Sequence, residues 1–565
     1  MPQDAFHIRR LAKELKEELV GGKINRISQV DKDELTLIIY AQKRTVRLII
    51  STNASNARVC LSQTEKTPAP VAPNFCMLLR KHLQGAEILD VQQWEYERII
   101  QITLHCTTDF SECDRVLHCE LMGKYSNVIL TEKGSILGAL KMTTLEENLA
   151  RPLFPGVKYI YPKPQEKCSP IDSAALQELF SAFFLSHSDE YSPEELARFL
   201  FENVAGFAPS TARELVKIYI QQGHGMPVWQ FIPHFFQNQP SEAHLLPDGK
   251  GGYADFFAFP IQGGIKAQTL CAAEDAFYTA KENKKGFEDK KRKLESAIRT
   301  LKKKLAKKAQ DTFDRLQEAE NAEENKIKGE LLTANLYRME KGMKFIELEN
   351  WYDENCATIK IALDETLPPA KNAQRYFKAY NKQKRAKEIL TPIYQDELRE
   401  MDYADSVLAS VLLADCAEDL KGIEEELIAL GLLKSPKERV GQKKKEEPAL
   451  FREFEKDGFK ILVGRNNIQN DKLLRLASPN DIWLHTQKYH SSHVIIVVDG
   501  RQVRDEIILY AAKLCAYYSD GRGGEKVPVD YCQRKFVKKP NKAKAGFVIY
   551  TDYKTVLVSG TKAEP

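Results

Sequence analysis

Two opposite charges, Glu97 and Arg98, stand side by side in an apolar, β-prone segment of the chain, VQQWEYERIIQI at residues 91–102. Neighbouring residues of a β-strand point to opposite faces of the sheet, so a strand here would present the two charges on different faces. An arginine in such a position can pair with a phosphate or stack on a base, and a carboxylate can accept a hydrogen bond from an exocyclic amine. The alternative is an ordinary ion pair on a partly exposed strand.

A second polar segment, ELMGKYSN at residues 120–127, has the composition of a turn that approaches an RNA backbone. Gly123 is followed by basic Lys124 and then by the small polar residues Ser126 and Asn127. The alternative is a hairpin turn in which the serine and the asparagine satisfy only the local backbone.

Aromatic and basic residues gather near the C-terminus. Asp481, Trp483 and His485 alternate in the segment DIWLHT, so they share one face of the predicted strand. A tryptophan between an aspartate and a histidine can stack on a base, or it can pack inside the protein. Residues 531–545 then contain six basic residues and no acidic one, namely Arg534, Lys535, Lys538, Lys539, Lys542 and Lys544. This density of like charge indicates a polyanionic ligand, and we favour RNA.

The net charge of +4 is distributed unevenly over the 565 residues. Residues 431–565 contain 26 Lys and Arg against 16 Asp and Glu, a net charge of +10, which leaves the rest of the chain at −6. A basic C-terminal module on a nearly neutral body indicates a polyanionic partner. Residues 281–310 contain 13 basic and 4 acidic residues, which fits either a solvated helix face or an arm that faces RNA.

Composition argues against several classes of protein. The N-terminus, MPQDAFHIRRLAKELKEEL, lacks the apolar core of a signal peptide, and no uncharged apolar run approaches the length of a membrane span. The eleven cysteines show neither CxxC nor zinc-ligand spacing, which indicates reduced thiols in a reducing cytosol. We therefore expect a cytoplasmic monomer that uses no membrane, metal ion or cofactor.

The length of the chain suggests three to five modules, and the overall fold class is multidomain α+β. Residues 1–170 combine a first helix with strand-like runs, which predicts a domain of mainly antiparallel strands, and a strand region near 251–262 returns to it. Residues 171–245 read as helices around the turn GFAP at 206–209, a helix-hairpin-helix whose backbone N–H groups can face a phosphate. Glycine turns of this kind are also common in ordinary helical hairpins.

A long helical arm is predicted for residues 270–434. Leu294, Ile298, Leu301 and Leu305 are spaced by four, three and four residues, which is a heptad seam. Two short strands near 340–370 interrupt the helical pattern, so the simplest arrangement is an antiparallel coiled coil with a small β tip. Residues 435–450 form a polar linker, and residues 451–565 form a final α/β module.

Several segments, in this order along the chain, together resemble the NFACT family and its bacterial, RqcH-type ribosome quality control factors. They are NFCMLLRKHLQG, the segment with Glu97 and Arg98, ELMGKYSNVIL, KGELLTANLY, LDETLPPAKNAQRYFKAY, and VGRNNIQND with DIWLHTQKYHSSHVIIV. The resemblance covers essentially the whole chain. It implies a glycosylase-like α/β NFACT-N domain, the helix-hairpin-helix, the coiled coil and a C-terminal NFACT-R RNA-binding domain.

The sequence departs from the family pattern at three places. Glu97 stands where many members have aspartate, and Lys124-Tyr125 stands where they often have Arg-His. His490-Ser491 replaces the usual Pro-Gly. Glutamate keeps the charge of aspartate but shifts the carboxylate, and the exchange at His490-Ser491 falls in the loop before His493.

The resemblance implies a role in ribosome-associated quality control. Members bind a large ribosomal subunit obstructed by peptidyl-tRNA and recruit charged tRNA, in bacteria tRNA-Ala, so that the stalled chain is extended with alanine without mRNA and marked for degradation. The ribosome makes the peptide bonds, so the protein is a recruiting factor and not an enzyme; a small RNA-binding helper factor is a further candidate partner. The implied tRNA-binding residues are Glu97, Arg98, Glu120, Met122, Lys124, Ser126, Asn127 and Arg80. Those implied to bind ribosomal or other RNA are Asp481, Trp483, His485, His493, Arg534, Lys535, Lys538 and Lys539.

Two rival functions belong to other classes. Relatives have been labelled fibronectin-binding proteins, which suggests a surface adhesin for fibronectin or fibrinogen, although the chain shows neither an export signal nor an anchor motif. The NFACT-N and helix-hairpin-helix combination also resembles formamidopyrimidine-type DNA glycosylases, which use an N-terminal proline amine followed by a glutamate. Here Gln3 follows Pro2 and no cysteine zinc finger is present, so we rank the glycosylase last.

Overall fold

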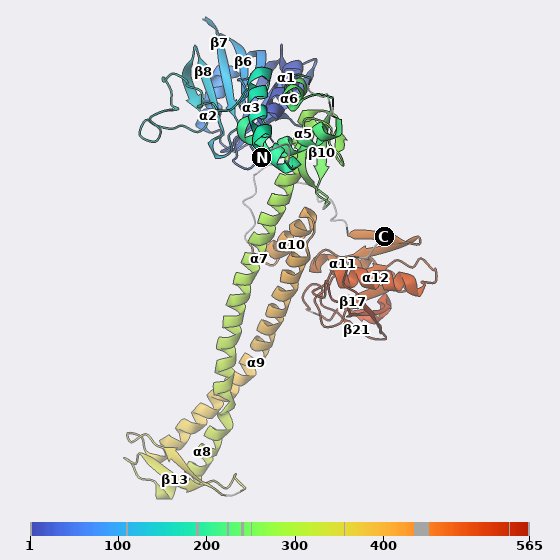
Figure 1. The fold of residues 1–565 in the computed structure, drawn as a ribbon. Helices are drawn as coiled ribbons and strands as arrows, with labels where there is room; N and C mark the ends of the chain where they lie inside the picture. Colours follow the sequence, from blue (N-terminus) through green and yellow to red (C-terminus); the bar gives the residue numbers. More distant parts are fainter. Residues whose placement is uncertain are drawn as a thin grey trace. The chain divides into compact units, whose positions relative to one another are not determined.

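The computed structural model describes residues 3–108, 111–187, 191–222, 225–238, 242–249, 251–354, 356–433, 451–541 and 543–562. It divides into two compact units, Met1–Lys284 and Lys285–Pro565 (Figure 1). Among the helices of these ranges, none combines the length with the apolar character that crossing a membrane requires.

A nine-stranded antiparallel sheet forms the body of the first unit, in the order β4-β3-β2-β1-β5-β6-β7-β8-β9. Its strands are β1 (Lys23–Asp31), β2 (Glu34–Ala41), β3 (Arg44–Ser51), β4 (Arg58–Leu61), β5 (Glu87–Gln93), β6 (Ile99–Thr108), β7 (Ser111–Glu120), β8 (Asn127–Glu132) and β9 (Ser135–Ala139). All neighbours except β1 and β5 follow one another in sequence, so successive antiparallel hairpins build the sheet. The mainly antiparallel strands predicted for this region are confirmed.

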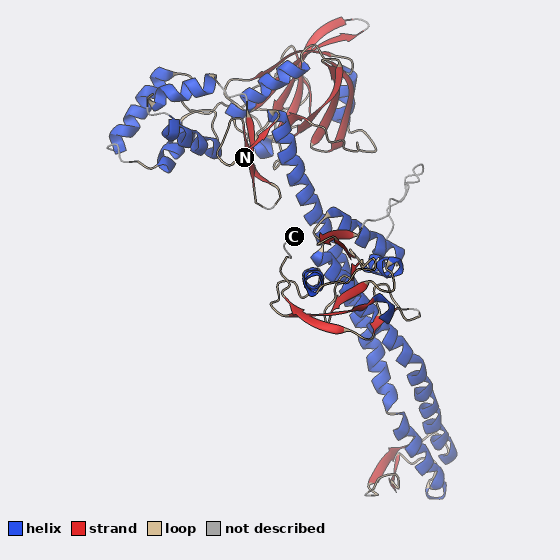
Figure 2. Ribbon diagram, turned by 90° about the vertical axis from the view of Figure 1, so that its right-hand side faces the viewer, coloured by secondary structure: helices blue, strands red, loops and turns tan. Residues whose placement is uncertain are grey.

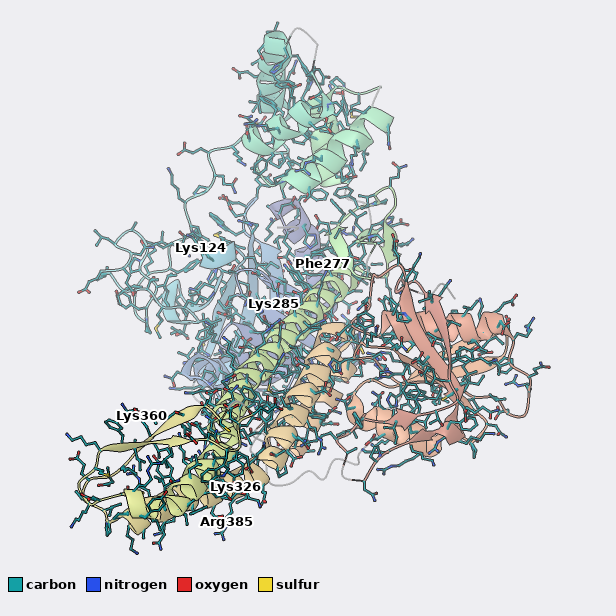
Figure 3. All side chains as sticks on the ribbon, turned by 90° about the horizontal axis from the view of Figure 1, so that it is seen from below. Lys124, Phe277, Lys285, Lys326, Lys360 and Arg385 are labelled. Carbon is teal, nitrogen blue, oxygen red and sulfur yellow. The ribbon has the colours of Figure 1, made fainter. Side chains whose placement is uncertain are left out.

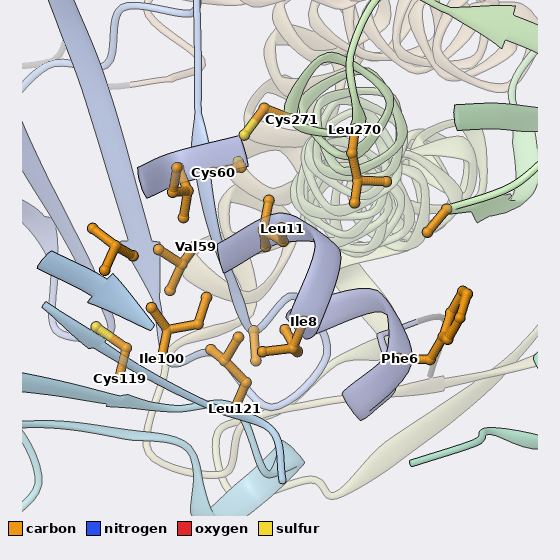
Figure 4. Packing of buried hydrophobic residues seen from close by; sticks show 14 of the residues in the cluster. Phe6, Ile8, Leu11, Val59, Cys60, Ile100, Cys119, Leu121, Leu270 and Cys271 are labelled. Atoms are coloured by element: carbon orange, nitrogen blue, oxygen red, sulfur yellow. The ribbon is translucent and has the colours of Figure 1, made fainter. Parts of the chain in front are cut away.

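Helices α1 (Ala5–Leu19) and α2 (Asn74–Leu83) pack on this sheet. The apolar residues of α1 recur at helical spacing and are buried, because they face one side of the helix. Figure 4 shows Ile8 of α1 close to Ile100 of β6 and to Leu121, which directly follows the last residue of β7. This packing anchors the end of the sheet at which β6 begins and β7 ends.

A helical module and a small sheet complete the first unit: α3 (Ser173–His187), α4 (Pro193–Asn203), α5 (Pro209–Gln222), α6 (Val228–Gln237), β10 (Ala243–Pro247), β11 (Tyr253–Phe257) and β12 (Ile265–Ala267). Asp4 joins the α4–α5 hairpin to α1. One carboxylate oxygen caps α1 by accepting from the amide of His7, and the other accepts from the amide of Ala208, both at 2.8 Å. The Ala208 amide of the predicted phosphate-facing hairpin is therefore already satisfied within the protein.

Two long antiparallel helices, α7 (Leu270–Glu320) and α9 (Pro369–Leu413), pair in the second unit (Figure 2), to which α7 belongs from Lys285 onward. The ammonium of Lys302 pairs with the carboxylate of Asp405, and that of Lys308 lies 3.3 Å from Glu397, so residue numbers rise along one helix as they fall along the other. Leu294 is buried in the cluster between the helices. Supercoiling of the pair remains a prediction of the heptad spacing.

The far end of these helices carries α8 (Ala322–Ala334) and a hairpin of β13 (Phe345–Glu349) with β14 (Thr358–Ala362). Apolar side chains of the helix and the hairpin form a small core that includes Leu331, Ile346 and Ile361. Lys326 and Lys360 lie in this part of the chain (Figure 3).

The C-terminal domain contains a six-stranded antiparallel sheet in the order β15-β16-β18-β17-β19-β22. Its elements are β15 (Arg452–Lys456), β16 (Phe459–Val463), α11 (Asn467–Leu476), β17 (Ile482–Thr486), β18 (Val494–Ile496), α12 (Asp505–Tyr517), β19 (Val527–Gln533), β20 (Val537–Lys538), β21 (Ile549–Tyr550) and β22 (Lys554–Val558). The domain docks on α10 (Ala417–Ala429), where buried Asp419 accepts from Arg452 at 2.6 Å and from Arg465 at 2.5 Å.

Candidate nucleic-acid interface

Glu97 and Arg98 lie in the turn between β5 and β6, and not inside a strand. The amide of Trp94 donates to the carbonyl of Ile99 at 3.1 Å and closes the hairpin, while the amide of Glu97 donates to the carbonyl of Trp94 at 3.2 Å. Glu95 has a φ of +47°, in the left-handed region that ends the alternation of a strand. The prediction that the two charges point to opposite faces of a strand is therefore wrong, because the chain reverses direction at these residues.

The connection between β7 and β8 lies beside this turn. Ile99 pairs with Glu120, and the amide of Leu121 donates to the carbonyl of Arg98 at 2.8 Å. The short 3-10 helix Gly123–Tyr125 follows, and Asn127 of β8 pairs with Glu120. Two segments that are distant in sequence thus meet at one end of the sheet, with the predicted site residues of both.

Glu120 is buried and its charge is neutralised inside the protein. The guanidinium of Arg151 bonds to both carboxylate oxygens, one of them at 3.1 Å, and the hydroxyl of Tyr159 donates to the carboxylate at 2.7 Å. Burial, followed by the charge of Glu120, raises the pKa of Tyr159 far above its usual range, so this hydroxyl keeps the proton that it donates. Glu120 therefore shapes the site and offers almost no surface to a ligand.

Lys124 and Tyr125 are the accessible residues of the β7–β8 connection. Tyr125 is 71% exposed, and the ammonium of Lys124, a residue labelled in Figure 3, lies 4.9 Å from the centre of the Tyr125 ring. Ser126 and Asn127 are buried, and the side chain of Asn127 accepts from the amide of Lys141 at 2.9 Å and donates to its carbonyl at 2.7 Å. A cation with an exposed aromatic ring suits contact with phosphate and base, whereas the buried pair holds the loop.

Two of the predicted RNA-binding residues of the C-terminal domain, Trp483 and Asp481, are interior. Trp483 is fully buried and belongs to a core cluster, so it packs on protein, one of the two alternatives left open by the sequence. Asp481 is buried and accepts from the amides of Ser478 at 2.7 Å and Val498 at 2.9 Å. These two residues position the strand and its loops in this structure.

Two histidines lie against Trp483. The ring of His485 stacks parallel to the indole at 5.7 Å, and that of His493 meets it edge-on at 5.4 Å. Burial lowers the pKa of His485 to about 4 and that of His493 well below its usual value, so both rings are neutral at pH 7. His493 is fully buried, whereas His485 lines a cavity.

The basic residues near the C-terminus differ in how much of their charge is available. Lys535 and Lys538 are exposed and form no ion pair with any residue of the described ranges. Lys539 pairs with Asp471, and Arg534 donates to the carbonyl of Leu474 at 2.9 Å. Lys542 lies outside the described residues. The free charges are thus those of Lys535, Lys538 and, further along, Lys544.

Two known protein families together match residues 4–551 of the chain. Residues 4–447 match the family described as NFACT N-terminal and middle domains, and residues 448–551 match the one described as NFACT protein RNA binding domain. The chain belongs to the NFACT family. The resemblance read from the sequence is thereby confirmed.

Full-length relatives of this NFACT protein carry the name Rqc2 homolog RqcH. The one from Bacillus subtilis (strain 168) is 32% identical over 578 residues, which cover 99% of this chain and 98% of the relative. The one from Streptococcus pneumoniae serotype 2 is 33% identical over 570 residues, with the same coverage. Among solved structures, the N-terminal part of the fibronectin/fibrinogen-binding protein from Streptococcus suis is 27% identical, with a TM-score of 0.42, and covers 49% of this chain and 98% of that chain.

The segment at 154–167 of the NFACT protein contains no helix or strand, and it contacts the candidate site. The ring of Tyr161 stacks on Trp94 at 4.2 Å with an interplanar angle of 7°, and the amide of Gln165 donates to the carboxylate of Glu97 at 3.2 Å. Sequence reasoning missed Arg151, Tyr159 and Tyr161. The only available signal was the alternation of tyrosines in VKYIYPK, which is typical of residues that share a face.

Arg80 lies apart from this cluster. It belongs to α2, and its Nε donates to the carbonyl of Ile27 in β1 at 2.8 Å. The carbonyl of His82, at the end of the same helix, accepts at 2.8 Å from Arg115, which is five residues before Glu120 along β7. The structure therefore brings together all the predicted tRNA-binding residues except Arg80.

Proposed function

We propose that this NFACT protein acts in ribosome-associated quality control in the cytoplasm. It binds a large ribosomal subunit obstructed by peptidyl-tRNA and recruits charged tRNA, specifically tRNA-Ala, for alanine tailing of the stalled chain without mRNA. The ribosome forms the peptide bonds, so the protein acts as a monomeric recruiting factor and not as an enzyme. Family membership over the whole chain supports this role.

The observation that carries the tRNA part of the proposal is the meeting of two loops at one end of the sheet. Glu97 and Arg98 are half-exposed in a turn whose backbone is tied to both strands, and Lys124 and Tyr125 are exposed in the adjacent loop. A turn held this firmly loses little conformational freedom when it binds. The carboxylate, guanidinium, ammonium and aromatic ring together suit the phosphates and unstacked bases of an RNA loop.

Ribosome binding is assigned to the C-terminal domain, because its exposed residues Lys535 and Lys538 are separate from this cluster in the sequence and form no ion pair within the described residues. Contacts between lysines and phosphates release counterions, so binding to the large subunit weakens linearly on a logarithmic salt scale. Each contact contributes roughly −0.7 to −0.9 to the slope of the logarithm of the binding constant against the logarithm of the salt concentration, so two contacts contribute about −1.4 to −1.8.

Cosedimentation with purified large subunits across a salt series tests the proposal. Lys535→Glu with Lys538→Glu should lower binding and make the slope shallower, whereas Arg98→Ala should leave both unchanged. The matched control is Lys513→Glu with Lys526→Glu, which reverses two other exposed lysines of the same domain. Binding that ignores salt, or equal losses in the test and control pairs, contradicts the proposal.

A further inference from the structure

The second unit contains a cavity of about 1160 Å³ between α9 and the C-terminal domain, which lie beside each other in Figure 1. Its domain-side wall comes from the start of α11, the end of β17 with the following loop, residues 540–541 and 543–548, and Tyr550. The side chain of Asn467 bridges the two walls by donating to Ser406 at 3.0 Å and to Glu426 at 3.1 Å. The volume is at the upper end of small-molecule sites and accommodates a nucleotide.

Two aromatic rings of the wall are available for stacking. Tyr489 is 42% exposed and Phe547 is 52% exposed, although both line the cavity. Exposed aromatic faces at the edge of a cavity are unfavourable in water and bind bases by stacking. Tyr550, by contrast, is tied to Asp530 by a hydrogen bond of 2.8 Å and packs against Trp483, so it serves as fixed wall.

The charges of the cavity are divided between its two sides. Lys488 and Lys544 on the domain side are exposed and form no ion pair with any described residue. The acids lie on α9, where Asp396 pairs with Arg399 at 2.9 Å and Asp402 faces His490 at 3.9 Å. Glu400 also lines this side. An anionic group is therefore favoured at the lysines and disfavoured at the helix.

His485 provides a polar contact of defined direction. Because burial keeps the ring neutral, its Nδ1 carries the proton that is donated to the carbonyl of Thr486 at 2.8 Å. Its Nε2 is then an acceptor, suited to the N–H groups on the edge of a nucleobase. Two exposed aromatic rings, two lysines and the neutral imidazole of His485 thus line the same cavity.

We propose that this cavity binds an unstacked nucleotide, with its base stacked on Phe547 or Tyr489 and its phosphate at Lys488 and Lys544. The nucleotide is either a residue of single-stranded RNA or a free nucleoside monophosphate, since both present the same groups. Duplex RNA is excluded because its base faces are covered. The inference concerns the isolated chain and does not depend on the ribosomal role.

Fluorescence anisotropy with the purified full-length chain tests the proposal. The probe is a labelled, unstructured RNA octamer; unlabelled AMP, GMP, CMP, UMP, inorganic phosphate and a duplex of the same composition are competitors. Phe547→Ala should weaken octamer binding by about fivefold to a hundredfold, the usual loss of one stacked base. Adding Lys544→Ala to this variant should weaken octamer binding further, because the phosphate contact is then lost as well. Phe547→Tyr keeps the ring and should retain binding, which separates stacking from misfolding.

Leu557→Ala and Lys554→Ala are the matched controls, since both residues are exposed on β22 and neither lines the cavity. Competition by monophosphates identifies a free nucleotide as the ligand, and competition by single strands alone identifies RNA. The proposal is overturned if Phe547→Ala and Tyr489→Ala each bind like the wild type, if the controls lose as much affinity as the cavity variants, or if duplex competes as well as single strand. Binding to the large subunit is measured separately, so failure of the nucleotide site is distinguished from failure of the ribosomal role.

Discussion

Arg151→Ala is the sharpest test of how the candidate tRNA site is built. The change removes the guanidinium from Glu120, a carboxylate only 1% exposed, and leaves Tyr159 as its remaining partner. Breaking a buried ion pair costs about 3–5 kcal/mol. Because the Arg151 side chain is 18% exposed and one hydrogen bond survives, we expect a local loss of about 3 kcal/mol, the low end of that range.

Hydrogen exchange at the amide of Leu121 reports this loss, since its bond to the carbonyl of Arg98 joins the two loops. A loss of about 3 kcal/mol corresponds to exchange roughly a hundredfold faster. The control is Arg198→Ala, which removes an exposed pair with Glu202 and should change exchange at Leu121 by less than about twofold. A folded Arg151→Ala protein that exchanges Leu121 at the wild-type rate refutes the idea that the Arg151–Glu120 pair holds the site.

Three further predictions concern other parts of the chain. Burial, helped by the charge of Arg151, lowers the pKa of His118 to about 4 in the folded protein. In the unfolded chain this histidine takes up its proton near pH 6.5, so the free energy of unfolding decreases as pH drops from about 6.5 to about 4. His118→Gln should flatten that part of a plot of melting temperature against pH. Asp4→Ala should lower the free energy of unfolding by about 2 kcal/mol, because the α1 cap and the hydrogen bond from the Ala208 amide are lost. Asp4→Asn should have a stability between those of the wild type and Asp4→Ala, and chemical unfolding of the first unit measures both. Asp419→Ala leaves Arg452 without its buried partner and should destabilise the contact between α10 and the C-terminal domain by about 3–5 kcal/mol. The measurement is amide hydrogen exchange in α10, which should become faster.

Local patterns predicted much of the fold. The first helix, the antiparallel strands of the first unit and the β hairpin at 345–362 all follow from hydrophobic periodicity and turn residues, which act over a few neighbouring residues. The buried positions Leu294 and Ile298 were readable from heptad spacing for the same reason.

The position of Glu97 and Arg98 was not readable in this way. The apolar residues on both sides continue the strand pattern, and the turn depends on a left-handed Glu95 that no glycine or Asn-Gly pair announces. The stacking of Tyr161 on Trp94 is a contact between residues 67 positions apart, which local propensity cannot specify.

The C-terminal residues illustrate a different limit. Alternation correctly placed Trp483 and His485 on one face, but it did not distinguish an outer face from a core. The cavity beside His485 needs residues from α9, α11 and the segment at 543–548, and their approach to one another is a property of the tertiary structure alone.

The length of alanine tails on a stalled reporter tests the central claim most directly. The comparison is between wild type, Glu97→Asp, and the double variant Glu97→Ala with Arg98→Ala, with tRNA and large-subunit occupancy measured in the same pull-down. The loss of charge-assisted contacts, each worth roughly 1.5–3 kcal/mol, predicts tails that are short or absent in the double variant, with tRNA lost and the large subunit retained, while Glu97→Asp stays close to wild type. Normal tails from a folded double variant contradict the account.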